Sequence, residues 1–160
     1  MLEQTVSEGT LDNAVQEQLT SDFLPPEWEV VHLGEVGTIS GGSTPSTKVP
    51  EYWGGEIPWL TPGEVTKQDG LFISQTDRYI TNVGLAHSSA KLLPIGTVMM
   101  TSRATIGEVV INTVPMVTNQ GFINIKCDEE KVFNEFLAYW IKQNKKKIEA
   151  YANGVTFREV

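Results

Sequence analysis

Cysteine is nearly missing from this chain of 160 residues. Cys127 is the single cysteine, which excludes an internal disulfide and a cluster of thiolate metal ligands. A reduced, cytoplasmic setting is therefore expected. Apolar runs are short as well, because none approaches the roughly 18 residues that a membrane helix requires. The first residues also lack the basic and apolar segments of a secretory signal, so we expect no membrane partner.

Basic residues are missing from the first 30 positions, which contain seven acidic residues: Glu3, Glu8, Asp12, Glu17, Asp22, Glu27 and Glu29. The net charge of the whole chain is −8, and an acidic chain is an unusual partner for nucleic acid. The remaining 130 residues carry 13 acids and 12 bases. The body of the protein is thus close to neutral, which weakens that objection.

The same terminal stretch predicts the domain organisation. Residues 1–22 are polar and acidic, with a faint helical spacing through Leu11, Val15 and Leu19. We interpret them as a leader that is either disordered or a short helix. Pro25 and Pro26 cannot continue a helix, so a single folded domain is expected over residues 23–160.

Short β-type runs dominate the first part of that domain. A strand is predicted at Trp28–Leu33, a brief helical or turn segment at 33–39, and loops around one short strand at 41–70, where Gly and Pro recur. Further strands are predicted at 72–73, 78–80, 97–101, 108–112 and 122–126. The fold class is therefore α/β of the α+β kind: a mixed, mainly antiparallel sheet with peripheral helices.

One long C-terminal helix is predicted over residues 133–152. Its apolar residues recur at helical spacing: Phe133, Phe136, Leu137, Trp140, Ile141, Ile148 and Tyr151. Asn153-Gly154 provides a stop signal. Four lysines (142, 145, 146 and 147) crowd its second half. They are either a solvated face that complements the negative helix end or a contact to a phosphate backbone.

Catalytic motifs are also lacking. The stretch GGSTPSTK, residues 41–48, has the appearance of a phosphate-binding loop, but Thr47 replaces the required Gly and Val49 replaces the required hydroxyl. His32 and His87 have no second ligand at metal-binding spacing, and Ser88 lacks a glycine elbow. We expect no enzyme activity, no metal and no cofactor.

Six segments in a fixed order resemble the target recognition domain of type I restriction-modification specificity subunits. They are WEVVHLGEV with GGSTP (28–36 and 41–45), YW with GEIPWL (52–53 and 55–60), PIGTV (94–98), SR with IG (102–103 and 106–107), TNQG (118–121) and GVTF (154–157). The resemblance covers about residues 24–160.

The resemblance implies a non-catalytic module that reads one half of a bipartite site in double-stranded DNA. It implies assembly with methyltransferase (modification) subunits, with restriction subunits, and with a second recognition domain or a homodimer partner. The family pattern would continue beyond Val160 toward a spacer helix, so a half-subunit or a truncated product is considered. The alternative is a solitary module that docks on methyltransferase subunits without useful DNA binding of its own.

Under this reading, candidate DNA contacts are the polar residues of the Gly- and Pro-rich loops. They are Ser43, Thr44, Lys48, Thr61, Glu64, Thr66, Lys67, Ser88, Lys91, Arg103 and Thr105. A glutamate accepts from cytosine and a basic side chain donates to guanine in the major groove. Base reading is expected mainly within 61–91, the stretch that resembles the family least.

Structural alternatives apply to several of these residues. Ser43-Thr44-Pro45 is also typical of a turn with side-chain-to-backbone bonds, and Arg103 is also suited to pairing with a carboxylate such as Glu108. Trp53, Trp59 and Trp140 are predicted in the core. Asn119-Gln120-Gly121 is predicted as a structural turn.

Overall fold

A computed structural model of the chain describes residues 25–152. The predictions for the leader 1–22 and for residues 153–160 lie outside the described residues. By its internal contacts the chain divides into two units, Met1–Glu35 and Val36–Val160. No helix among the described residues has the length and apolarity needed to cross a membrane.

The described part of the first unit, residues 25–35, contains no strand. A turn joins Pro25 to Trp28, and the 3₁₀ helix η1 spans Leu33–Glu35. The Glu35 carboxylate accepts from the backbone N–H of His32 at 2.9 Å. The strand predicted at Trp28–Leu33 is therefore wrong. Alternating apolar residues suggested it, but Trp28, Val30 and Val31 are half exposed, and residues 25–35 contain no strand that could pair with them.

A five-stranded sheet forms most of the second unit, in the order β1-β8-β5-β6-β3. The strands are β1 (Gly37–Gly41), β8 (Phe122–Cys127), β5 (Val98–Thr101), β6 (Val109–Asn112) and β3 (Phe72–Ile73). All pairs are antiparallel except β3 with β6. Every residue of β5 and β6 is buried, which explains their continuous apolar runs.

A second sheet of three strands has the order β4-β2-β7. Its strands are β4 (Arg78–Ile80), β2 (Trp53–Leu60) and β7 (Val117–Thr118); β2 is antiparallel to β4 and parallel to β7. The mixed, mainly antiparallel architecture is thus confirmed. β1 and β7 were not predicted, because β1 is rich in Gly and polar residues and β7 has only two residues.

The predicted C-terminal helix is wrong as a single element, because it is two helices: α4 (Asn134–Gln143) and α5 (Lys145–Tyr151). The break is at Asn144, whose side-chain amide donates to the carbonyl of Trp140 at 2.9 Å. Such a local side-chain bond competes with helix continuation. The other helices are η2 (Pro50–Tyr52), α2 (Pro62–Val65) and α3 (Asn82–Ala86).

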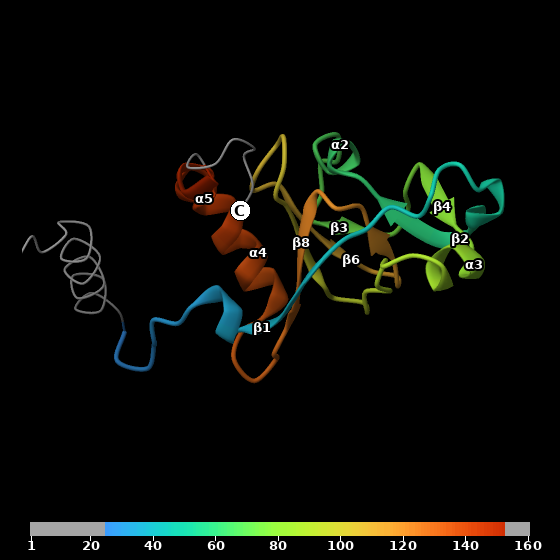
Figure 1. Cartoon of the computed structure of the whole chain (residues 1–160). Coiled ribbons are helices and arrows are strands. Elements are labelled where there is room, and N and C mark those ends of the chain that lie inside the picture. Colours follow the sequence, from blue (N-terminus) through green and yellow to red (C-terminus); the bar gives the residue numbers. More distant parts are fainter. Residues whose placement is uncertain (1–24, 153–160) are drawn as a thin grey trace, which may run out of the picture. The chain divides into compact units, whose positions relative to one another are not determined.

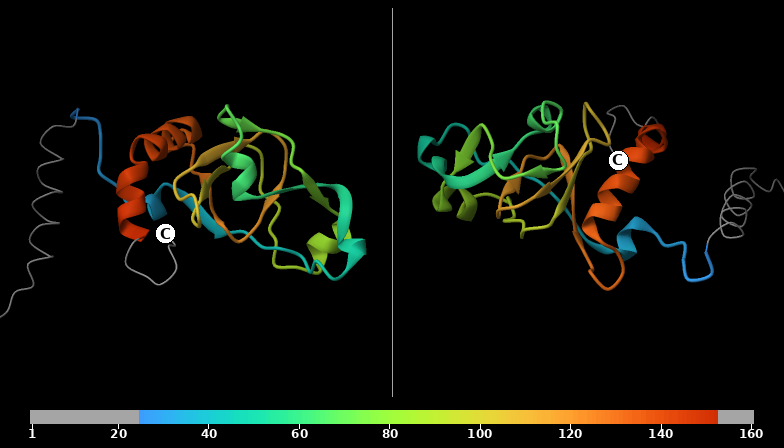
Figure 2. Two further views of the ribbon diagram at one scale, coloured as in Figure 1. Left: turned by 90° about the horizontal axis from the view of Figure 1, so that it is seen from above. Right: turned by 180° about the vertical axis from the view of Figure 1, so that it is seen from behind.

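The two helices α4 and α5 lie at one end of the second unit, and β2, β4 and α3 lie at the other (Figures 1 and 2). We call these the helical end and the loop end. The main core cluster is built mostly on strands and contains Leu60, Val65, Ile73, Leu93, Met99, Val110, Met116 and Phe122. A second cluster at the loop end joins Trp59, Ile80 and Val117.

The apolar stripe of the C-terminal segment divides between core and surface. Leu137, Ile141 and Ile148 are buried as predicted. Phe133, Phe136, Trp140 and Tyr151 are exposed instead, and Trp140 keeps 42% of its surface exposed. The prediction of Trp140 as a core residue is therefore wrong, while Trp59 is buried and Trp53 partly buried. Helical spacing alone did not separate the inner side of α4 from its outer side.

Candidate nucleic-acid interface

Two tryptophans form the scaffold of the loop end. Trp53 and Trp59 meet edge to face, with ring centroids 5.1 Å apart. A register shift within β2 places Trp53 opposite Ile80, the same residue that Ile57 faces. Glycine permits this irregularity: Gly54 has a φ of +79°, and a Cβ on Gly55 would lie 2.5 Å from the Ile80 carbonyl oxygen.

The two indoles hold the hydroxyl-rich loop, residues 43–48, through its backbone. Trp59 Nε1 donates to the carbonyl of Ser43 at 3.0 Å, and Trp53 Nε1 donates to the carbonyl of Ser46 at 3.1 Å. The aromatic residues thus fix the position of the loop. These two bonds use backbone carbonyls of the loop and not its side chains.

Three segments distant in sequence meet at this loop. The hydroxyls of Ser43 and Ser89 are 2.8 Å apart, and Thr44 donates to the side-chain oxygen of Gln120. The expected side-chain-to-backbone turn at Ser43-Thr44 is therefore replaced by side-chain pairs. Asn119 accepts from the Gly121 N–H at 2.8 Å, so the turn predicted at 119–121 is confirmed.

The basic residues of this end are exposed. Lys48 and Lys91 make no ion pair or side-chain hydrogen bond within residues 25–152. Ser88 is partly buried and donates to the carbonyl of Leu85 at 3.3 Å, which ties it to the end of α3. His87 stacks on Tyr52, with centroids 5.8 Å apart. Lys48 and Lys91 are thus better placed for an external anion than Ser88.

The candidate residues around α2 differ in how far their side chains are already hydrogen-bonded within the domain. Glu64 accepts from the N–H and the hydroxyl of Thr61 at 2.8 and 2.6 Å, and its other oxygen accepts from the N–H of Asp77 at 2.6 Å. This capping box engages Thr61 and Glu64 in the structure of α2. Thr66 donates to the carbonyl of Gly63 at 3.0 Å, while Lys67 is exposed.

A cavity of about 380 Å³ opens beside α2. Ile73 lines it together with residues that carry amide, hydroxyl and charged groups of both signs: Glu64, Lys67, Gln68, Gln75, Thr76 and Asp77. Such a mixture of donors and acceptors suits base edges better than phosphate oxygens alone. The cavity lies within 61–91, where base reading is expected.

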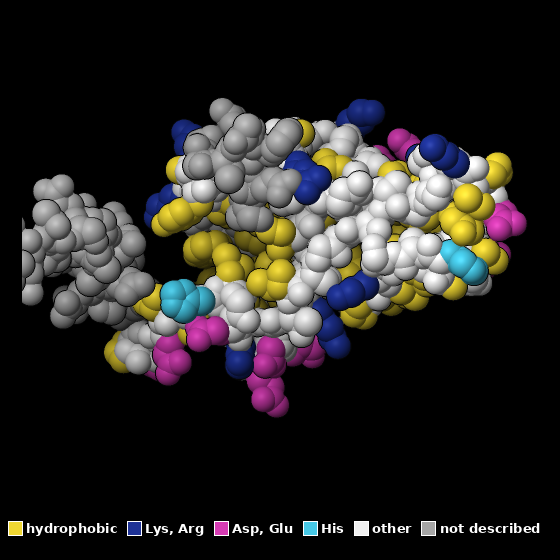
Figure 3. Space-filling view, in the orientation of Figure 1, with side chains coloured by type: hydrophobic (Ala, Val, Ile, Leu, Met, Phe, Trp, Pro, Cys, Tyr) yellow, Lys and Arg dark blue, Asp and Glu magenta, His cyan; other side chains and the backbone are white. Residues whose placement is uncertain are grey.

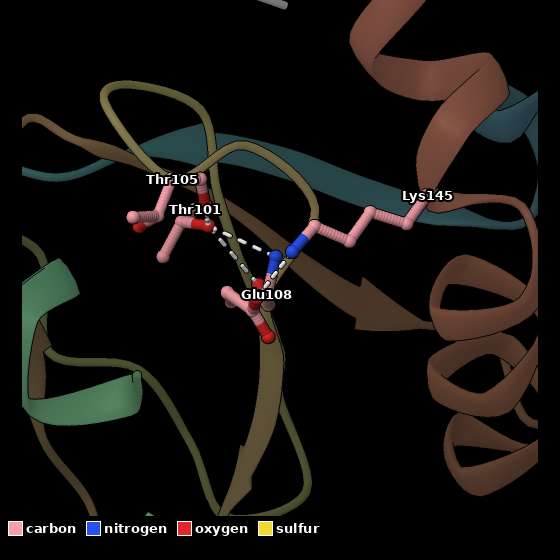
Figure 4. A network of polar contacts seen from close by, with 4 residues as sticks. All are labelled: Thr101, Thr105, Glu108 and Lys145. Carbon is pink, nitrogen blue, oxygen red and sulfur yellow. Dashed lines mark hydrogen bonds and ion pairs between the residues drawn. The ribbon is translucent and has the colours of Figure 1, made fainter. Parts of the chain in front are cut away.

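The remaining candidates, Arg103 and Thr105, belong to a different place. Their loop joins β5 to β6 and is tied to the helical end, because Glu108 at its base pairs with Lys145 of α5 (Figure 4). Thr101 bonds both to the carbonyl of Thr105 and to the N–H of Glu108, the latter at 3.0 Å. The carboxylate of Glu108 thus faces Lys145, and the pairing of Arg103 with a carboxylate stays a prediction.

Arg78 at the loop end was missed by sequence reasoning. Its guanidinium carbon lies 3.6 Å from the centroid of the Trp53 ring. The available signal was its place in a β-type run that follows two tryptophans, but only the strand pairing places it on them. Elsewhere in residues 25–152, no three His, Cys, Asp or Glu side chains lie together as a metal site. Burial raises the pKa of the Cys127 thiol.

The model of the family "Type I restriction modification DNA specificity domain" matches residues 25–160. The chain belongs to this family. It is 40% identical over 139 residues to the MjaIX specificity subunit of Methanocaldococcus jannaschii, covering 86% of this chain and 32% of that protein. It is 34% identical to the EcoR124I/EcoR124II specificity subunit of Escherichia coli, covering 68% and 27%. The specificity domain thus spans about a third of the length of these relatives.

Solved structures of specificity subunits share the fold. The HsdS subunit from Thermoanaerobacter tengcongensis aligns with a TM-score of 0.65 at 18% identity, covering 96% of this chain and 39% of that one. The S subunit from M. genitalium aligns with a TM-score of 0.51 at 17% identity, covering 86% and 34%. The α+β arrangement of the specificity domain is therefore the fold of that group.

The electrostatics of the specificity domain are balanced. Residues 36–152 contain eleven Lys and Arg and eleven Asp and Glu, whereas residues 1–35 contain eight acids and no base. On the face in Figure 3 the basic side chains are scattered over several places. Because acids and bases balance over residues 36–152, affinity for an anionic polymer would depend on a few well-placed cations.

Proposed function

We propose that this specificity domain recognises one half of a bipartite double-stranded DNA target for a type I restriction-modification complex, without chemistry of its own. The observation that carries the proposal is the match to the DNA specificity family over residues 25–160, which include every described helix and strand. The resemblance of the sequence motifs supports the same assignment.

The loop end is the proposed DNA-facing surface. Ser43, Thr44, Lys48, Ser88 and Lys91 lie on loops that the tryptophan scaffold and α3 hold in place. A rigid scaffold that presents polar loops is the usual way to position recognition residues. Here the lysines would contact phosphates and set the position of the domain on the duplex.

The α2 region is the proposed base-reading part. Lys67 and Thr66 are exposed beside the cavity, while Thr61 and Glu64 would act by holding α2 in shape. Reading at Arg103 and Thr105 would require the duplex to extend toward the helical end. We therefore rank these two below the others as DNA contacts.

Assembly with methyltransferase subunits is the second part of the proposal. α4 presents aromatic residues outward: Phe136, Tyr139 and Trp140 are 48%, 55% and 42% exposed. Figure 3 shows hydrophobic side chains gathered over α4. Exposed aromatic surface of this kind is typical of protein–protein contacts. Contacts to restriction subunits and to a second recognition domain or homodimer partner follow from the family alone.

A titration of the full chain with duplex DNA tests the first part. Fluorescence anisotropy at several salt concentrations should show binding that weakens as salt rises. Absence of binding at low salt, even with methyltransferase subunits added, would contradict DNA reading. It would favour the alternative, a module that docks on methyltransferase subunits without useful DNA binding. For the second part, Trp140→Ala should weaken co-purification with methyltransferase subunits, and Lys126→Ala on β8 is the exposed control.

A further inference from the structure

Arg78 occupies an unusual position on the loop end. It lies on β4 directly opposite Trp59 of β2. Its guanidinium carbon is 3.6 Å from the ring centroid of Trp53 and 5.1 Å from that of Trp59. Both distances are within the range of a cation–π interaction, for which tryptophan is the best ring. Two indoles therefore hold one guanidinium against the sheet.

The hydrogen-bond donors of Arg78 are unused within residues 25–152. The side chain is exposed, and it makes no ion pair or side-chain hydrogen bond to any residue in that range. Lys145 contrasts with it, because that cation is paired with Glu108. A guanidinium has five donors in a rigid planar fork. Stacking restrains this fork in advance, which lowers the entropy lost when a ligand binds at its edge.

The surroundings favour an anion at that edge. The same indoles hold the carbonyls of Ser43 and Ser46, so Arg78 and the hydroxyl-rich loop are fixed to one scaffold. The loop adds the exposed cation Lys48. Asp77 precedes Arg78 in the sequence, and its carboxylate does not pair with the Arg78 guanidinium. The backbone N–H of Asp77 donates to Glu64.

We propose that Arg78 binds a phosphate of the DNA backbone and that Trp53 is its positioning residue. This rests on the proposed DNA recognition. The planar fork matches two phosphate oxygens. A base contact fits less well, because a guanidinium held 3.6 Å from the Trp53 ring centroid is not extended to reach into a major groove about 8.5 Å deep.

Salt-dependent titration of mixed-sequence duplexes with the full chain tests this. Arg78→Gln should weaken binding about ten- to hundredfold on every duplex, since hydrogen bonds to charged groups are the strong ones. The slope of log affinity against log salt should fall by about one. Lys147→Gln, an exposed unpaired cation of the helical end, should change neither. Thermal unfolding verifies that each variant is folded.

Further variants distinguish the effect of the charge of Arg78 from the effect of its position on Trp53. Arg78→Lys and Trp53→Leu keep the cation, so affinity should fall while the salt slope stays, and Trp53→Phe should recover part of the loss. Unchanged affinity and slope in Arg78→Gln, with wild type binding DNA, would overturn the inference alone. A changed preference at one base pair with an unchanged slope would overturn the phosphate assignment. Failure of the wild type to bind any duplex would overturn the proposed function as well.

Discussion

The loop end and the helical end of the specificity domain differ in what they leave exposed. The loop end packs Trp59, Ile80 and Val117 into a buried cluster, and it presents cations that make no ion pair among residues 25–152. The helical end pairs Lys145 with Glu108 and presents aromatic rings on α4. Polar loops on a rigid scaffold suit DNA, and an aromatic face suits protein. The difference agrees with the proposal that DNA binds at the loop end and methyltransferase subunits at the helical end.

The largest expected effect concerns the two sides of α4. Ile141 is fully buried, whereas its neighbour Trp140 points outward. Ile141→Ala should lower the free energy of unfolding by about 2–5 kcal/mol, because it leaves a cavity. Trp140→Ala should cost no more than about 1 kcal/mol, as a surface change does. Chemical denaturation measures both, and equal costs would mean that α4 has no distinct outer side.

The next effect concerns Glu64, which we interpret as structural. Glu64→Ala removes the acceptor of three hydrogen bonds at α2, and it should destabilise the domain by about 1–2 kcal/mol. Glu56→Ala, an exposed change on β2, is the matched control and should be neutral. An unchanged stability with altered preference at one base pair would instead make Glu64 a base reader.

A smaller effect should distinguish the lysines of the two ends. Lys48→Ala should weaken DNA binding a few-fold on all sequences and reduce the salt slope by about one, because it removes one phosphate contact. Lys146→Ala on α5 should leave both quantities unchanged. A slope that falls for Lys146→Ala and not for Lys48→Ala would place the DNA on the helical end and reverse the comparison.

The smallest effect concerns the ion pair that anchors the β5–β6 loop to α5. The side chains of Lys145 and Glu108 are 35% and 33% exposed. Lys145→Met keeps most of the stem and should cost about 0.2–1 kcal/mol, less at high salt. Lys147→Met is the control, because Lys147 makes no ion pair among the described residues. Thermal unfolding at two salt concentrations compares them, and equal changes would show that the pair contributes nothing.

Patterns in the sequence predicted those strands that are apolar over several residues, such as β5, β6 and β8. They failed where a strand depends on its neighbour, as in β1 and β7, and where apolar alternation at Trp28–Leu33 had no partner. At the candidate interface, the sequence indicated polar loops, and their role in DNA contact stays a prediction. It did not separate Glu64, whose carboxylate is occupied, from Lys67, which is exposed, because hydrogen bonds between distant segments are not visible in residue spacing.

The sequence by itself determined the family, the α+β class and the polar loops with their tryptophan scaffold, because motifs and apolar periodicity are local properties. Only the tertiary structure decided which side of α4 is buried, that Asn144 divides the C-terminal helix, and that Glu108 pairs with Lys145. It also placed Arg78 on Trp53, through a register shift that glycines permit. These outcomes depend on which surfaces meet in space, and no single stretch of the chain specifies that.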